Sequence, residues 1–191
     1  MEPDFEVIFM TGPQGSGKGT QDRRLAKRLD FFLWDMGAIL RDMLHAGGPH
    51  AERLAPISEG MLLDDAVIID VLSERLPDIP PGKGVIFDGV PRRMAQAEFL
   101  LDWLRAHGRR DMVGICIDLP REESMERLLQ REKIEGRPDD TPERIERRLR
   151  AFDDESRPML EYLKTQMRFI TVDGMPPVEE VEREIDAALG I

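Results

Sequence analysis

Short apolar runs alternate with amphipathic segments along the whole chain. Five runs are apolar and short enough to be buried strands: residues 5–10, 31–34, 85–87, 112–117 and 168–172. Apolar positions recur at helical spacing in seven other segments: residues 18–29, 37–44, 64–76, 93–107, 121–131, 142–164 and 177–189. Apolar strands that alternate with helices indicate a parallel sheet with helices on both faces.

Glycine and proline mark where several of these elements end. A Gly-Gly-Pro sequence at 47–49 follows the second helix, and a Pro/Gly-rich stretch at 77–84 precedes the third strand. Pro158 lies inside the segment 142–164. Because proline lacks the N–H group that a helix requires, this residue predicts a kink there.

The composition is that of a globular chain. With 191 residues, 41% of them hydrophobic and 34% charged, the chain corresponds to about one domain with room for insertions. No apolar run approaches the roughly 18 residues of a membrane-spanning helix, and the acidic start lacks the basic region of a secretory signal. The one cysteine, Cys116, excludes an intrachain disulfide and a cysteine-rich zinc site, and its apolar neighbours predict a buried core residue. These features predict a cytoplasmic protein.

The charge balance limits the classes of partner. Acidic residues outnumber basic ones by 38 to 27, for a net charge of −11. This argues against binding of nucleic acid through a broad basic face. Arginine supplies 22 of the 27 basic residues, and its planar guanidinium binds phosphate through two parallel hydrogen bonds. A local arginine pocket for a phosphorylated small molecule therefore remains compatible with the composition.

The most informative stretch is GPQGSGKGT at 12–20, between the first strand and the first helix. Glycines let several backbone N–H groups point at one phosphate, the helix N-terminus adds a favourable dipole, and Lys18 adds a positive charge. The stretch therefore predicts a phosphate-binding loop. Gly19 stands between Lys18 and Thr20, where the general P-loop pattern has Ser or Thr directly after the lysine. A dinucleotide-binding loop, with Asp35 as the ribose-binding acid, is the nearest alternative, although its glycine spacing differs.

Three polar residues after the third strand suit a nucleotide substrate. Asp88 ends an apolar strand, at the position that faces the metal in a P-loop sheet. Arg92 follows directly and is placed to bind an acceptor phosphate. Gln96, one helical turn later, can offer donors and an acceptor to the edge of a base.

Together these segments resemble the adenylate kinase family of nucleoside monophosphate kinases over nearly the whole chain. The resemblance is carried by GPQGSGKGTQ at 12–21, MGAILR at 36–41, EGMLLDD at 59–65, FDGVPRRMAQAEFL at 87–100, and RLLQREKIEGRPDD and ERRL within 127–149. The loop variant with Gly19 before Thr20 is the one that such kinases use. The resemblance implies an α/β fold of the P-loop NTPase type, with three layers around a five-stranded parallel sheet. It also implies a reversible, magnesium-dependent transfer of the terminal phosphoryl group of ATP to AMP, giving two ADP.

The family's functional residues are carried over by position. The resemblance implies catalytic roles for Lys18, Arg92, Arg131, Arg137 and Arg148. It implies ATP binding by Gly15, Ser16, Gly17, Lys18, Gly19, Thr20, Arg127 and Arg131. It implies AMP binding by Met36, Arg41, Leu63, Gly89, Arg92, Gln96, Arg137 and Arg148. Arg127 is expected to stack on the ATP base, and Asp88 is expected to hold magnesium through water.

The resemblance also implies a division of the chain. Residues 1–34, 67–131 and 143–191 would form the core, and residues 35–66 an insertion that covers the monophosphate. Residues 132–142 would form a short lid, which lacks the four zinc ligands of some longer lids, so no structural zinc is expected. The expected partners are ATP, AMP and ADP, with neither nucleic acid nor a membrane, and the protein is expected to be a monomer.

Three positions depart from the family pattern. Met36 and Ala38 stand where the family has a threonine and an aspartate. Ala38 therefore removes a carboxylate that would help to order the waters around magnesium. Asp64 stands beside the expected acceptor base, where a proline or a small residue is common. The chain has no asparagine, which pyrimidine-specific relatives use to read their base, and this favours AMP. A kinase for CMP or UMP and a non-catalytic nucleotide-binding module remain the alternatives.

Overall fold

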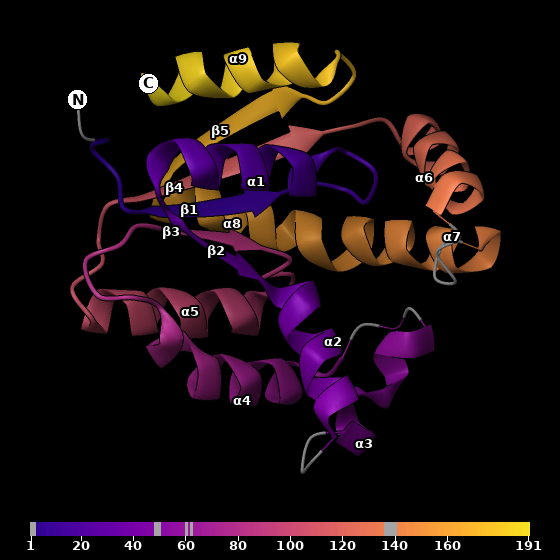
Figure 1. The fold of residues 1–191 in the computed structure, drawn as a ribbon, viewed down its shortest axis with the longest axis horizontal. Helices are drawn as coiled ribbons and strands as arrows, with labels where there is room; N and C mark the ends of the chain where they lie inside the picture. Colours follow the sequence, from indigo (N-terminus) through magenta and orange to yellow (C-terminus); the bar gives the residue numbers. More distant parts are fainter. Residues whose placement is uncertain (1–2, 48–50, 60, 62, 136–140) are drawn as a thin grey trace.

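Five parallel strands form the centre of the structure, a computed structural model that describes residues 3–47, 51–59, 61, 63–135 and 141–191. The strand order in the sheet is β2-β3-β1-β4-β5 (Figure 1). In chain order, the strands are β1 Val7–Thr11, β2 Phe32–Asp35, β3 Val85–Asp88, β4 Met112–Asp118 and β5 Arg168–Asp173. The five predicted strands are confirmed, with ends that differ by at most two residues.

Alternate residues of the central strand β1 face opposite layers of helices. Val7 and Phe9 belong to one buried cluster, whereas Ile8 and Met10 belong to another. The helices on the Ile8 side are α1 Lys18–Leu29 and α9 Val178–Leu189. The helices on the Phe9 side are α4 Asp65–Arg75, α5 Met94–Ala106 and α8 Arg157–Gln166. The predicted three-layer arrangement is therefore confirmed.

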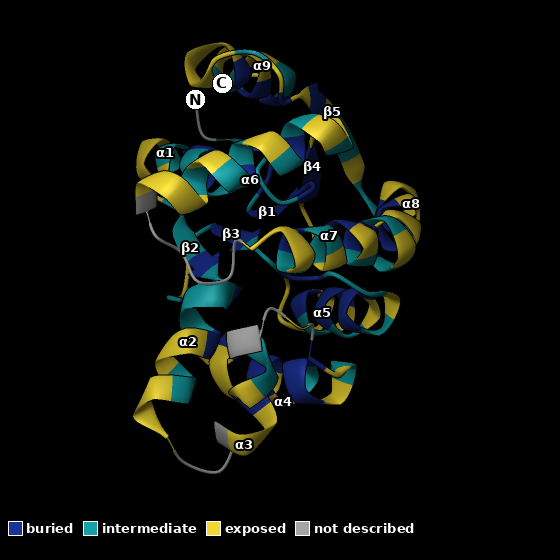
Figure 2. Cartoon of the chain, turned by 90° about the vertical axis from the view of Figure 1, so that its right-hand side faces the viewer, coloured by how far each residue is buried: buried dark blue, intermediate teal, exposed yellow. Residues whose placement is uncertain are grey.

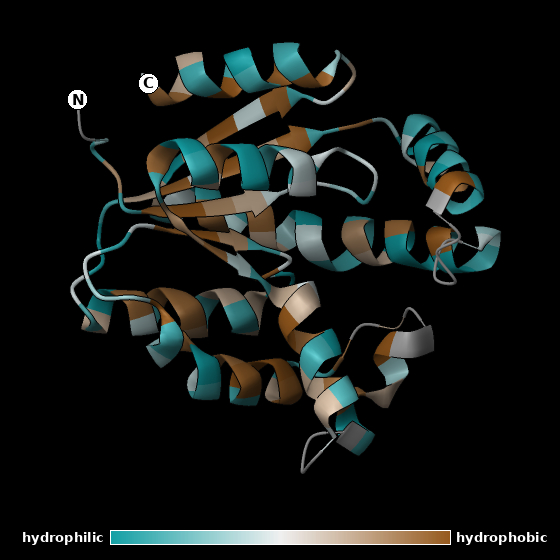
Figure 3. Cartoon of the chain, viewed as in Figure 1, coloured by the Kyte–Doolittle hydropathy of each residue, from teal (hydrophilic) through white to brown (hydrophobic). Residues whose placement is uncertain are grey.

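Burial and hydropathy follow this layering. In Figures 2 and 3, buried and hydrophobic residues concentrate in the strands and in the helix sides that face them. Exposed, hydrophilic residues lie on the outer sides of α1, α9 and α6 Arg121–Glu135. Cys116 is buried, as predicted. No helix in the described part of the chain is long and apolar enough to cross a bilayer.

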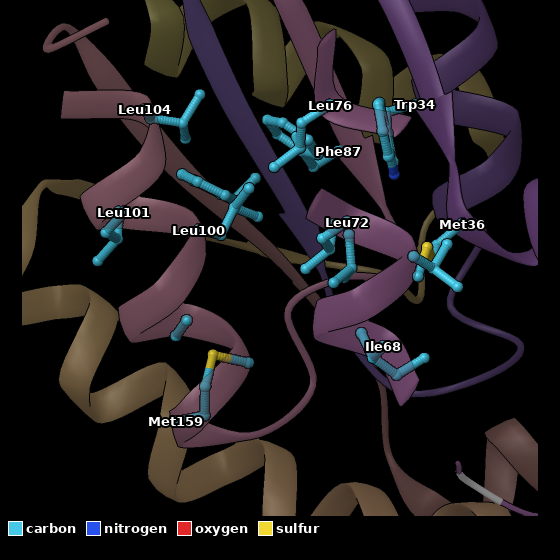
Figure 4. Packing of buried hydrophobic residues seen from close by; sticks show 14 of the residues in the cluster. Trp34, Met36, Ile68, Leu72, Leu76, Phe87, Leu100, Leu101, Leu104 and Met159 are labelled. Atoms are coloured by element: carbon cyan, nitrogen blue, oxygen red, sulfur yellow. The ribbon is translucent and has the colours of Figure 1, made fainter. Parts of the chain in front are cut away.

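Aromatic side chains on one face of β1, β3 and β2 pack together and fix the strands that carry the site. The rings of Phe9 and Phe87 stack with centroids 5.4 Å apart, and Trp34 tilts against Phe87 at 5.7 Å. Figure 4 shows Trp34 and Phe87 in one cluster with Met36 and Ile68. Met36 begins α2 Met36–Ala46 and Ile68 lies on α4, so both of these helices are anchored to the core.

The carboxyl ends of β1, β2 and β3 lie side by side, at the end of the sheet that carries the site. The parallel register pairs Asp88 with Met10 on one side and with Asp35 on the other. The glycine-rich loop leaves β1 next to Met10, and α2 leaves β2 directly after Asp35. Segments far apart in the sequence are thus brought to one crevice, where ligands of open α/β sheets bind.

The described residues between 36 and 59, which belong to the segment predicted to be an insertion (35–66), lie to one side of the sheet (lower right in Figure 1). The segment contains α2, the short helix α3 Ala51–Leu54 and a 3₁₀ turn at Ala55–Glu59. The side chain of Asp35 accepts a hydrogen bond of 2.8 Å from the backbone N–H of Ala38, which caps α2. Asp35 is therefore a capping residue, a role that the dinucleotide-binding alternative did not include.

The predicted helix 142–164 consists of two helices joined by an irregular turn. Helix α7 spans Pro142–Ala151, a π-helical turn spans Phe152–Ser156, and α8 follows. Pro158 has no N–H to donate to a carbonyl in the preceding turn, so the hydrogen-bond ladder is interrupted there. The interruption is confirmed, although it lies just before Pro158 and not at the residue itself.

Candidate functional site

A cavity of about 580 Å³ opens at the carboxyl edge of the sheet. The predicted site residues that line it are Gly15, Gly17, Lys18, Gly19, Thr20, Met36, Arg41, Leu63, Asp88, Gly89, Arg92, Gln96, Arg127, Arg131 and Arg148. Ser16 does not line the cavity, because its side chain is buried beneath the loop. Arg137 lies outside the described residues. One cavity thus gathers residues from the loop, α2, α4, α5, α6 and α7, while their individual roles remain predictions.

Glycine is required at two positions of the loop. Gly12 has φ +135°, and a Cβ added there would lie 2.3 Å from the carbonyl oxygen of Ile117. Gly17, immediately before α1, has φ +93°. Residues with a side chain rarely adopt either backbone conformation. The two glycines let the loop turn so that the start of α1 points at the cavity. The free N–H groups and the helix dipole at this end favour an anion.

Lys18 adds a partly buried positive charge at the same end of α1. Its Nζ donates hydrogen bonds to the backbone carbonyls of Gly12 at 2.7 Å and Pro13 at 2.8 Å. Burial lowers the pKa of Lys18 to about 8, and the carboxylate of Asp88 limits this shift. The ammonium is therefore charged at neutral pH and held against the loop.

Asp22 is a charged residue beside the site that the sequence analysis missed. It lies on the buried face of α1, its side chain is fully buried, and neither carboxyl oxygen has a hydrogen-bond partner among the described residues. Burial, reinforced by the charge of Asp88 and opposed by Lys18, raises the pKa of Asp22 well above its usual value. A protonated Asp22 would be able to donate a hydrogen bond to Asp88, the neighbouring carboxylate that helps to raise its pKa. The available signal was its position on the same helical face as Leu25 and Ala26.

Replacing Asp22 with asparagine is expected to raise stability at pH 8 more than at pH 4. The pKa of Asp22 is raised in the folded state. Its contribution to the free energy of unfolding is therefore complete below its pKa in the unfolded chain, and is lost as pH rises through its pKa in the folded protein. Asparagine does not ionise, and its amide keeps a donor for Asp88. We expect the variant's advantage in free energy of unfolding to grow by at least about 1.4 kcal/mol, the value of one pKa unit.

Urea denaturation at pH 4, 6 and 8 measures this difference. The matched control is Asp102→Asn, which removes an exposed carboxylate from α5. Its difference from the wild type is expected to stay nearly constant with pH. A constant difference for Asp22→Asn as well would contradict the assignment of a raised pKa.

Positive charge dominates the described lining of the cavity. Its cationic side chains are Lys18, Arg23, Arg41, Arg92, Arg127, Arg131 and Arg148. Its carboxylates are Asp35 and Asp88. Arg23 was not predicted. In a chain with a net charge of −11, this local excess of cations is suited to a polyanionic ligand.

Arg92 lies among these cations with a fixed side chain. Its Nε donates a hydrogen bond of 3.0 Å to the backbone carbonyl of Gly89. Burial lowers the pKa of Arg92, Asp88 opposes the shift, and the positive charge of Arg148 adds to it. A partly buried guanidinium near another cation is stabilised by an anion between the two.

Arg127 is fixed on α6 at the cavity wall. Its guanidinium donates to the carboxylate of Glu123 at 2.7 Å and to the carbonyls of Gly174 at 2.9 Å and Met175 at 3.2 Å. These bonds hold the planar group between α6 and the segment after β5. Stacking on the ATP base, the predicted role of Arg127, remains a prediction.

The part of the cavity beside α2 and α4 is apolar and carries one buried amide. Its apolar lining residues are Met36, Leu40, Ile57, Met61, Leu63 and Ile68. The amide belongs to Gln96, which is only 4% exposed. An apolar slot with one amide fits a flat heteroaromatic ring whose edge carries hydrogen-bonding groups.

Comparison with known proteins establishes the relationship. The model of the adenylate kinase family matches residues 10–168. The chain belongs to the adenylate kinase family. It is 41% identical to the adenylate kinase of Thermus thermophilus over 192 residues, which cover 100% of both chains. It is 38% identical to that of Maricaulis maris and 36% identical to that of Phenylobacterium zucineum, each over 183 residues. These two alignments cover 95% of this chain and 97% and 96% of the relatives.

Membership of the adenylate kinase family confirms the predicted resemblance and makes the chain a nucleoside monophosphate kinase. Adenylate kinases use ATP with Mg²⁺, and Asp88 fits such an ion. A Cβ added to Gly19 would lie 3.9 Å from Oδ2 of Asp88, so this carboxylate faces the phosphate loop. Proteins commonly hold Mg²⁺ through one or two carboxylates together with water and substrate phosphates. Within the described residues, no three His, Cys, Asp or Glu side chains form a metal-binding group.

Proposed function

We propose that the protein catalyses the reversible, magnesium-dependent transfer of the terminal phosphoryl group of ATP to AMP, giving two ADP. The supporting observation is that the phosphate loop, a cluster of cations, a set of apolar side chains and Gln96 line one cavity. The loop and the cations suit polyphosphates, and the slot suits a purine base.

ATP would bind along the loop and α6. The backbone N–H groups of residues 15–20 and the ammonium of Lys18 would bind its outer phosphates. Arg131 would bind the same phosphates from α6, and Arg127 would stack on the base. The start of α1 supports this placement, because it directs its unpaired N–H groups at the cavity.

AMP would bind between α2, α4 and α5. Arg41 and Arg92 would hold its phosphate, and Gln96 would read its base. Met36 and Leu63 would contact the faces of the base, and Gly89 would line the same pocket. The apolar lining and the buried amide of Gln96 support this placement.

Transfer of a phosphoryl group depends on positioning and charge neutralisation more than on covalent chemistry. Lys18, Arg92, Arg131 and Arg148 would surround the group in transit, and Arg137 would join them from the lid. Held by Asp88 through water, Mg²⁺ would neutralise phosphate oxygens of ATP. The cations already face one cavity, so little reorganisation of charge is required during the reaction.

Water must be kept from the phosphoryl group during transfer. We propose that residues 35–66 and the lid at 132–142 close over a core formed by residues 1–34, 67–131 and 143–191. We also propose that the protein acts as a monomer, because the loop, the cations and Gln96 of a single chain line one cavity. The single cysteine, which cannot form an intrachain disulfide, supports a reducing, cytoplasmic location, and burial raises the pKa of its thiol.

Parallel assays with ATP, Mg²⁺ and one of AMP, CMP, UMP or GMP test the proposal. We expect turnover with AMP to exceed turnover with each other acceptor by at least about 100-fold in kcat/KM, because the slot presents one specific amide. Faster turnover with CMP or UMP would reassign the acceptor. No turnover with any acceptor would favour the non-catalytic alternative.

A further inference from the structure

The side chain of Gln96 is held on both sides of its amide. Its Oε1 accepts a hydrogen bond of 2.9 Å from the backbone N–H of Arg92. Its Nε2 donates one of 2.8 Å to Oδ1 of Asp65, the first residue of α4. Both partners belong to elements that line the cavity, so the amide is fixed relative to the cavity wall.

These two partners permit only one orientation of the amide. A backbone N–H can only donate, so it requires the oxygen of Gln96, and a carboxylate accepts, so it requires the NH₂ group. A rotation by 180° would place N–H against N–H and oxygen against oxygen. Gln96 is nearly fully buried, so water could not compensate for these lost hydrogen bonds.

Asp65 is itself held in position by Arg93. Nη1 of Arg93 lies 3.6 Å from Oδ1 of Asp65 and donates a hydrogen bond of 3.0 Å to the carbonyl of Leu63. Nε of the same guanidinium pairs with Glu155 on the π-helical turn. Asp65 is therefore tied to a framework that spans three elements and does not depend on a ligand.

The fixed amide presents its remaining groups in a defined order. One lone pair of Oε1 and one N–H of Nε2 are left over, and Gln96 lines the cavity. A 6-aminopurine presents an amino donor beside a ring-nitrogen acceptor, which matches this order. A 6-oxopurine presents an oxygen acceptor beside an N–H donor, and it would require the reversed amide.

We propose that Asp65 is a specificity-determining residue, which selects a 6-aminopurine monophosphate over a 6-oxopurine monophosphate by fixing the orientation of the Gln96 amide. The proposal rests on the proposed function, because it requires that the acceptor base meets Gln96. Asp65 does not line the cavity itself, so it acts by positioning Gln96 and not by contact with the base.

The test compares kcat/KM for AMP and for IMP in the wild type and in Asp65→Asn. An asparagine at position 65 offers either an oxygen or an NH₂ group, so the reversed Gln96 amide then finds a partner at residue 65 and opposes only the backbone N–H of Arg92. We expect the AMP/IMP ratio to fall by at least about 10-fold, within the range that a bidentate amide–base contact provides. We expect the ratio to change through KM for AMP and IMP more than through kcat. A merely structural defect would instead lower kcat/KM for AMP and for IMP together.

Two further variants make the result decisive. Asp65→Glu keeps an acceptor-only group and is expected to retain more selectivity than Asp65→Asn. Asp70→Asn removes the carboxylate that pairs with Arg53 on the exposed side of α4, and it is expected to leave the ratio within twofold of the wild type. An unchanged ratio in Asp65→Asn, or equal selectivity in the Asn and Glu variants, would overturn the role of Asp65. Absence of AMP turnover in the wild type would instead overturn the proposed function.

Discussion

Replacing Lys18 with methionine is expected to lower kcat/KM for ATP at least about 100-fold, the magnitude of losing a donor aimed at transition-state charge. Methionine has a similar length and is apolar, so the loop loses its ammonium with little change in volume. The hydrogen bonds to the carbonyls of Gly12 and Pro13 are lost as well. Steady-state kinetics with ATP varied at saturating AMP measures the effect.

The control for this substitution is Lys27→Met on the same helix. Lys27 is exposed in the last turn of α1 and does not line the cavity. The Lys27→Met substitution removes the same charge from the chain, so it corrects for a general effect of net charge. We expect kcat/KM within twofold of the wild type. Equal kinetics for the two variants would remove Lys18 from the mechanism.

The loop and the sheet were predictable because their signals are local. Gly12 and Gly17 adopt backbone conformations that only glycine readily tolerates, and α1 begins directly after them, as the sequence predicts. The strands are apolar throughout because both faces of the sheet are covered, which makes them recognisable without knowledge of their neighbours. These elements alone bring Asp88 to the loop.

Asp22 and Asp65 were not predicted because their surroundings depend on tertiary contacts. Asp65 meets Gln96 across 31 positions of sequence, and nothing near either residue indicates the contact. The face of α1 that Asp22 shares with Leu25 and Ala26 indicates its burial, but only the position of β3 brings Asp22 close to Asp88. The exact place of the π-helical turn was also missed, because Pro158 predicts an interruption without specifying which turn widens.

Replacing Arg92 with alanine is expected to lower kcat/KM for AMP at least about 100-fold. Its guanidinium is partly buried near Arg148, so its removal halves the positive charge of a pair that is suited to one phosphate. The backbone is expected to stay in place, because the carbonyl of residue 92 accepts a hydrogen bond of 3.0 Å from the Ser156 hydroxyl. Kinetics with AMP varied at saturating ATP measures the loss.

Selectivity between acceptors separates this effect from a disturbed base pocket. The backbone N–H that holds Gln96 is kept in Arg92→Ala, so the AMP/IMP ratio is expected to stay within threefold of the wild type while both rates fall. Arg105→Ala serves as the control, because Arg105 lies at the other end of α5 and bonds Gln166 on the exposed surface. A wild-type rate in Arg92→Ala would show that this arginine does not hold the acceptor phosphate. A loss confined to AMP would show instead that the side chain of Arg92 supports the base pocket.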